Sequence, residues 1–150
     1  MMIAIANDHT GLELKKAVIE EITELGLEYL DLGTNSAGSC DYPVQGELAA
    51  RAVADGRCQL GIVICGTGAG IGMAANKVRG IRCAMASEPY TAIMARQHND
   101  ANMLALGARV LGTELAKLIV RGFLTAGFEG SRHARRVGQI MDIEAREADR

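Results

Sequence analysis

The sequence predicts an α/β domain in which a parallel sheet is covered by helices on both faces. Short apolar runs alternate with segments of helical periodicity along most of the chain, as is typical of parallel sheets. The run at 60–65, centred on Ile62, Val63 and Ile64, is apolar throughout, as expected of a strand buried on both faces. A length of 150 residues suits one domain with a sizeable core, so we expect a single domain over 1–150.

Before that run, the chain supplies two strands and two helices. The expected elements are a strand at 2–6, a helix, a strand at 28–32, a loop at 33–43 and an alanine-rich helix at 45–54. The first helix is indicated by Leu14, Val18, Ile22 and Leu25, which recur at helical spacing until Gly26 ends it.

After that run, the alternation continues to the carboxyl-terminal part of the chain. The expected elements are the strand at 60–65, a glycine-rich turn, a helix from Met73 to near Gly80, a strand at 81–86, a helix at 90–97, a strand at 102–106 and a helix at 113–124. Pro89 suits the first position of its helix, and Thr113 is expected to cap the last one. The polar tail at 129–150 has too few apolar residues to fill a core layer, so we expect a helical arm that leans on another surface.

The composition excludes several classes of protein. A net charge of −2 with no basic run gives no reason to expect nucleic acid as a partner. No apolar stretch approaches membrane-spanning length and no signal peptide is evident, so we expect no membrane partner and a cytoplasmic location. The four cysteines lack metal-binding spacing, which argues against a structural zinc site, and we expect free thiols.

A glycine-rich segment follows the strand at 60–65 and begins with a cysteine. Cys65 is followed by Gly66, Gly68, Gly70 and Gly72, and then by residues that favour a helix. A buried strand that passes through a glycine turn into a helix N-terminus can bind an anion with its backbone N–H groups. The spacing matches neither the dinucleotide fingerprint nor the P-loop. We therefore expect an anion cradle beside a thiol, where amide donors can stabilise a thiolate.

Other polar residues follow the remaining strands, and ligands of open parallel sheets bind beyond the carboxyl ends of their strands. The residues expected at this edge are Asp8, His9, Cys65, Thr67, Ser87, Glu88, Gly107 and Arg109, with His98 and Asn99 just before the last strand. A thiol, an imidazole, a carboxylate, amide donors and an arginine together favour an enzyme that handles a small phosphorylated or carboxylated molecule.

Each of these residues also has a structural explanation. Cys65 can be a buried strand cysteine, Asp8 can cap the start of a helix, and His98 can cap the end of one. Arg132 and Arg136, one helical turn apart, can present two guanidinium groups to one phosphate or can form a solvated helix face.

Taken together, the motifs resemble the ribose-5-phosphate isomerase B family, which includes the galactose-6-phosphate isomerase subunits. The resemblance extends over nearly the whole chain. It rests on Asp8-His9 with Gly11, Asp41-Tyr42-Pro43, Cys65 to Ile71, Ala74 to Lys77, Ser87 to Tyr90, Arg96 to Asp100, and Arg132-His133 with Arg136. It implies a five-stranded parallel sheet in a three-layer α/β/α sandwich of the Rossmann or flavodoxin-like type. It also implies a homodimer or tetramer with active sites at the subunit interface.

The resemblance also implies roles for individual residues, in a reaction that uses no metal or other cofactor. Cys65 would be the base that moves a proton between carbon 2 and carbon 1 of a sugar phosphate through an enediolate. Thr67 and the N–H groups of Gly66, Gly68, Ala69 and Gly70 would hold the oxyanion. The remaining implied roles are ring opening by His98 with Asp8, sugar binding by Tyr42 and Asn99, and phosphate binding by His9, Arg109, Arg132 and Arg136.

The sequence leaves the sugar open. Ribose 5-phosphate is the leading candidate; allose 6-phosphate, galactose 6-phosphate and a tetrose phosphate are the alternatives. Asn7 and Thr10 stand where the family more often has small or apolar residues, which can alter the pocket wall. The competing class is a non-catalytic flavodoxin-like module that binds a nucleotide or phosphate. For such a module, loss of the Cys65 side chain should have no effect on function.

Overall fold

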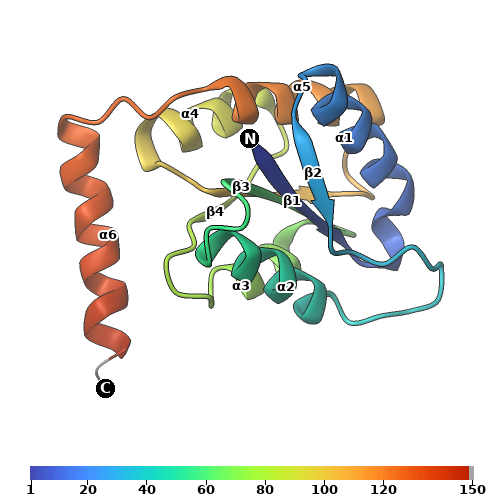
Figure 1. Cartoon of the computed structure of the whole chain (residues 1–150), viewed down its shortest axis with the longest axis horizontal. Helices are drawn as coiled ribbons and strands as arrows, with labels where there is room; N and C mark the ends of the chain where they lie inside the picture. Colours follow the sequence, from blue (N-terminus) through green and yellow to red (C-terminus); the bar gives the residue numbers. More distant parts are fainter. Residues whose placement is uncertain (149–150) are drawn as a thin grey trace.

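The computed structural model describes residues 1–148 and contains one parallel sheet of five strands (Figure 1). The strands are β1 (Met2–Asn7), β2 (Glu28–Asp31), β3 (Leu60–Cys65), β4 (Cys83–Met85) and β5 (Met103–Gly107). Their order across the sheet is β2-β1-β3-β5-β4. The chain moves from β1 to β2 in one direction and later to β3 on the other side of β1. The order therefore reverses between β1 and β3, which is where ligands bind in folds of this type.

Helices cover both faces of the sheet, which confirms the predicted three-layer α/β/α sandwich. The helices are α1 (Leu12–Glu24), α2 (Tyr42–Ala54), α3 (Ala69–Ala75), α4 (Pro89–Asn99), α5 (Thr113–Thr125) and α6 (Arg132–Ala148), with a short 3₁₀ turn η1 (His9–Gly11) before α1. In Figure 1, α1, α4 and α5 lie on one side of the sheet, whereas α2 and α3 lie on the other.

The two faces of the sheet carry side chains of different size. Toward α1, α4 and α5, the strands present large aliphatic residues such as Ile5 and Ile64, which pack around the fully buried Phe123. Toward α2 and α3, they present smaller residues such as Ala6 and Ala105. Burying one large aliphatic side chain contributes roughly 1.5–3 kcal/mol, so the first face supplies most of the hydrophobic stabilisation. The second face lets α2 and α3 lie close to the strands.

Two helices begin earlier than the sequence predicted. α2 starts at Tyr42, three residues before the expected start, and Pro43 occupies its first turn. α3 starts at Ala69, so Gly70 and Gly72 belong to the helix and only Gly66 and Gly68 remain in the turn. These helical glycines serve close packing, because an added Cβ at Gly70 would lie 2.6 Å from the Tyr42 ring.

Two other local predictions were wrong. β4 is three residues long, shorter than the expected strand, because the backbone N–H of Arg82 bonds the Asn102 side chain instead of a neighbouring strand. Thr113 is the first residue of α5 and Gly112 is its N-cap, so no side-chain cap is made there.

The predicted carboxyl-terminal arm is helical, and α6 packs against α4 of its own chain. The Glu144 carboxylate accepts a hydrogen bond of 3.0 Å from the backbone N–H of Gly80, and Arg82 donates to the sulfur of Met141. Residues 149–150 of the predicted arm lie outside the described residues. Among the helices described for residues 1–148, none has the length and apolar character needed to cross a membrane.

Candidate active site

A pocket of about 370 Å³ opens at the carboxyl ends of β1 and β3, where the strand order reverses. Residues from the segments after β1, β3 and β5 and from the first turns of α2 and α3 line it. They are Asp8, His9, Thr10, Tyr42, Cys65, Gly66, Thr67, Gly70 and Arg109. The pocket therefore contains five of the ten residues predicted at this edge of the sheet.

Cys65 is the last residue of β3, and its buried sulfur accepts a hydrogen bond from the next turn. The Gly68 N–H donates to Cys65 Sγ at 3.2 Å, and the Ala69 N–H donates to Thr67 Oγ1 at 3.3 Å. Two of the expected anion donors are thus bound to side chains of the loop itself. The Gly68 donor points at the thiol, where it would stabilise a negative sulfur.

Asp8 is held by its own loop, as the structural alternative for this residue predicted. Asp8 Oδ1 accepts hydrogen bonds from the Thr10 N–H at 2.9 Å and from Thr10 Oγ1 at 2.6 Å, and so caps the turn η1. Asn7 is buried and donates to the Asp8 carbonyl at 2.8 Å. Asn7 and Thr10 therefore fix the position of Asp8 in the pocket wall.

His9 is oriented by the loop that follows β2. The Cys40 N–H donates to His9 Nδ1 at 3.3 Å, so the neutral ring carries its proton on Nε2 and can donate it to a ligand. Lys15 anchors this loop: its buried Nζ bonds Asp31, the Thr34 carbonyl and Asn35, with distances of 2.8 to 3.2 Å. Cys40 was not predicted as a site residue, because nothing in the sequence relates it to His9.

The segment after β5 carries Arg109 across to the glycine loop. The Arg109 N–H donates to the Gly66 carbonyl at 2.9 Å, and the guanidinium lies over Gly66, where an added Cβ would be 3.6 Å from Nη1. Tyr42, at the start of α2, places its ring against Gly70. A backbone hydrogen bond thus positions Arg109 at the pocket, and close packing positions Tyr42 there.

His98 and Asn99 do not join this pocket, and the prediction that they lie at the same edge was wrong for one chain. α4 begins after the carboxyl end of β4 and runs back, so its last residues lie before the amino end of β5. Asn99 instead lines a groove beside α6, and His98 lies near Glu129 and His133. The expected proximity of Asp8 to His98 is likewise not found within one chain.

The first turns of α6 hold the two predicted phosphate-binding arginines of the tail. Arg132 and Arg136 are exposed and lie outside the pocket at the carboxyl edge. His133, between them, is buried and stacks on His98, with ring centroids 4.1 Å apart. Burial and the adjacent His98 lower the pKa of His133. The sequence could not predict this histidine pair, because the contact joins segments far apart in the chain.

The other cysteines do not line the pocket. All four are free thiols, as expected. Burial raises the pKa of the Cys83 thiol to about 12, and burial also raises the pKa of Cys58. Cys83 is the first residue of β4 and packs toward the α2–α3 face. It therefore suits the role of an inert structural thiol.

Replacing Gly68 by alanine should destabilise the protein by about 1–3 kcal/mol. Gly68 has φ +81°, and an added Cβ would lie 2.9 Å from the backbone carbon of Leu106. Gly112→Ala is the matched control, because Gly112 has φ −72° and nothing lies within 4 Å of its added Cβ. Chemical denaturation of the two variants would measure the difference; equal stabilities would show that the glycine turn is not constrained as described.

The sequence is similar to a family of sugar-phosphate isomerases. Residues 3–140 match the family described as Ribose/Galactose Isomerase. Ribose-5-phosphate isomerase B of Escherichia coli is 51% identical over 144 residues, which cover 96% of this chain and 97% of that protein. D-erythrulose-4-phosphate isomerase of Pectobacterium atrosepticum is 40% identical over 148 residues, covering 98% and 97%.

Solved structures show the same fold. Ribose-5-phosphate isomerase B of Clostridium thermocellum superimposes with a TM-score of 0.95 at 51% identity, covering 98% of this chain and 99% of that one. The Mycoplasma genitalium ribose-5-phosphate isomerase B with bound ribulose-5-phosphate has a TM-score of 0.91 at 44% identity, covering 96% of each chain. The chain therefore belongs to the ribose/galactose isomerase family and is an enzyme of the ribose-5-phosphate isomerase B type.

Proposed function

We propose that this enzyme interconverts ribose 5-phosphate and ribulose 5-phosphate, with Cys65 as the base. The proposal rests on the hydrogen bond that the Gly68 N–H donates to the Cys65 sulfur. The pocket around this sulfur also contains His9 and Arg109. A thiolate needs hydrogen-bond donors or positive charge close by to be populated at neutral pH. The relatives named for this reaction support the substrate, because they share about half of the sequence over nearly the full chain.

In the proposed mechanism, one base transfers one proton. The Cys65 thiolate removes the proton from carbon 2 of the open-chain aldose, and the electron pair moves to give an enediolate. The resulting thiol then returns a proton to carbon 1, while the hydroxyl proton on oxygen 2 passes to oxygen 1, so the ketose forms with no net gain or loss. Thr67 and the backbone N–H groups near Gly66 and Gly70 would stabilise the oxyanion, and no metal or cofactor is required.

The phosphate would be held at the side of the pocket formed by His9 and Arg109. His9 offers Nε2–H because its Nδ1 is occupied by the Cys40 N–H, and Arg109 offers its guanidinium over Gly66. Tyr42, which lies against Gly70 in the same pocket, would contact the sugar hydroxyls.

The remaining site residues would come from a second copy of the chain. His98, Asn99, Arg132 and Arg136 lie outside the pocket of their own chain, so we propose a dimer or tetramer in which a neighbour delivers them. His98 would then open the furanose ring with Asp8 of the other chain, and both arginines would reach the phosphate. Exposed apolar side chains near the carboxyl edge support burial by a partner: Met73 is 61% exposed, Met85 50% and Tyr90 71%.

A tetrose phosphate is the second candidate substrate. It is favoured by the relative named D-erythrulose-4-phosphate isomerase, which matches almost the whole chain. The pocket wall also differs from the expected pattern at Thr10, whose hydroxyl is bound to Asp8. Allose 6-phosphate and galactose 6-phosphate would need room for one more carbon in the same pocket.

A panel of four-, five- and six-carbon aldose phosphates, assayed with and without a chelator, tests this proposal. We expect the highest kcat/KM with ribose 5-phosphate and no change with the chelator. A higher kcat/KM with another sugar would reassign the substrate and keep the reaction. Inactivity toward every sugar would contradict the proposal and favour the non-catalytic binding module. Flavin or nucleotide bound to the protein would then identify that module.

A further inference from the structure

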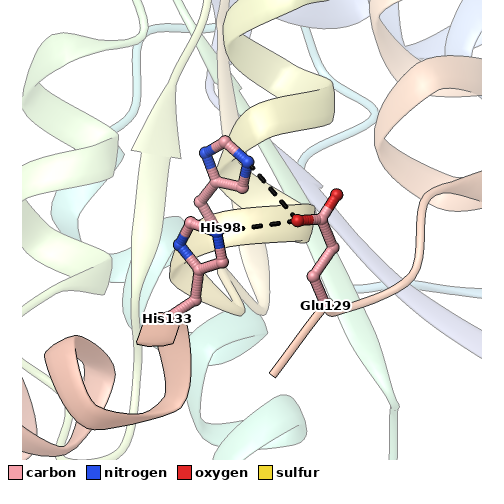
Figure 2. A group of neighbouring side chains, drawn as sticks. All are labelled: His98, Glu129 and His133. Atoms are coloured by element: carbon pink, nitrogen blue, oxygen red, sulfur yellow. Dashed lines mark ion pairs between the residues drawn. The ribbon is translucent and has the colours of Figure 1, made fainter. Parts of the chain in front are cut away.

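A cluster of two histidines and one glutamate lies at the amino edge of the sheet, away from the pocket described above. Figure 2 shows His98, Glu129 and His133 with both imidazoles facing one carboxylate oxygen. His98 Nε2 lies 3.7 Å and His133 Nε2 3.6 Å from Glu129 Oε2. The rings are stacked with an interplanar angle of 4°, so the in-plane Nε2 lone pairs run nearly parallel, and one ring must turn before both can bind one ion.

These distances fit an ion between the groups better than direct hydrogen bonds. N–H···O hydrogen bonds rarely exceed about 3.2 Å. Zinc ligands at about 2.0–2.2 Å from the ion lie roughly 3.4 Å from one another in a tetrahedron. The three ligand atoms all lie within 4.8 Å of one another, so rotation of the partly exposed His98 ring would bring them around one ion.

His133 gives an independent indication that this cluster binds a ligand. The residue is 5% exposed, and its Nε2 is buried without a hydrogen-bond partner. An unpaired buried polar atom costs about 1–3 kcal/mol, so such atoms usually have a ligand or another partner. The free Nε2 is the atom that faces the Glu129 carboxylate.

Backbone hydrogen bonds hold two of the three ligand residues in place. The Glu129 N–H donates to the Gln97 carbonyl at 3.0 Å, which fixes the glutamate beside the last turn of α4. The His133 N–H donates to the Gly130 carbonyl at 3.0 Å, at the first turn of α6. These bonds fix the segments that carry Glu129 and His133 before any ion binds, and the partly exposed His98 ring completes the site by turning.

We propose that His98, Glu129 and His133 bind a divalent transition-metal ion of the zinc class. Two imidazoles and one carboxylate form a donor set that suits zinc better than magnesium or calcium, and a water would complete the tetrahedron. The nearby Arg132 reduces the affinity through charge repulsion but leaves the three donor atoms in place. Binding does not depend on the proposed reaction. If His98 opens the sugar ring in a neighbouring subunit, the ion inhibits that step.

Calorimetric titration of the assembled protein with Zn²⁺ tests the site directly. The titration uses a Cys40→Ser, Cys65→Ala background, because these two thiols can also bind zinc. We expect one ion per chain, and an affinity at least about tenfold lower after Glu129→Gln or His133→Asn. Asp142→Asn, which removes an exposed carboxylate from the same helix, should leave the affinity unchanged.

Two results would overturn the metal site: no binding in this background, or equal affinity with and without the Glu129→Gln change. Glu129→Gln keeps the shape of the side chain and the backbone bond to Gln97, so it decides the question even if His133→Asn fails to fold. Cobalt(II) provides a second readout. Visible absorption bands of tetrahedral cobalt(II), without a sulfur-to-cobalt charge-transfer band, would support the proposed donors. A sulfur-to-cobalt charge-transfer band would instead place the ion on Cys58 or Cys83 and refute the site.

Discussion

Cys65→Ala should lower kcat by about 10²–10⁴-fold, because it removes the proposed base for proton transfer. KM should change little, since His9 and Arg109 remain in the pocket. Cys65→Ser should show a similar loss while filling most of the same volume, because a hydroxyl is a far weaker base at neutral pH. Steady-state kinetics on protein with an unchanged circular dichroism spectrum would measure these effects.

Cys83→Ala is the matched control for this experiment. Its thiol lies outside the pocket and has a pKa raised to about 12 by burial, so its loss should leave kcat unchanged. Ribulose 5-phosphate formed by the wild-type enzyme in D₂O should also carry deuterium at carbon 1. Full activity of the Cys65 variants would disprove the thiolate base, and absence of deuterium would disprove the exchangeable enediolate.

Mixing two inactive variants should restore activity if the site is shared between chains. Cys65→Ala and His98→Asn should each be nearly inactive as pure assemblies. In a dimer with one chain of each kind, one site has both defects and the other has none, so about half of the wild-type activity should return. Differently tagged chains, co-expressed and purified by both tags in turn, would provide the mixed dimer.

The same mixed dimer also tests the alternative arrangement, in which each site is built from one chain. If Cys65 and His98 of one chain served the same site, every site would carry one defect, and the mixed dimer would stay as inactive as its parents. Its composition is verified by intact mass. Arg132→Ala paired with Cys65→Ala extends the test to phosphate binding, with KM as the quantity that should recover.

The sequence predicted the carboxyl edge of the sheet well, because there the chemistry follows directly from the strands. β3 was predicted at its observed bounds, since its apolar run ends sharply before Gly66. Because parallel strands end at one edge, Asp8, Cys65 and Arg109 could be grouped without coordinates. The bounds of α3 were missed because Gly70 and Gly72 suggested a turn, whereas close packing is what requires them.

The misplacement of His98 had a physical cause that the sequence did contain. Its nearness to β5 in the chain suggested the active edge, but a helix that follows one parallel strand returns to the start of the next. Asn99 and His98 therefore had to lie at the amino edge. The contact of His98 with Glu129 and His133 was beyond the sequence, because it depends on how α6 packs against α4.

The separation of the two edges has a consequence for how such enzymes can diverge. Under the proposed arrangement, one chain carries the thiol half of the site at one edge and the imidazole half at the other. If two gene copies assemble together, each can lose a different half and the pair still keeps one working site. Under the proposed arrangement, a division of labour between duplicated subunits therefore requires no new fold, only complementary losses.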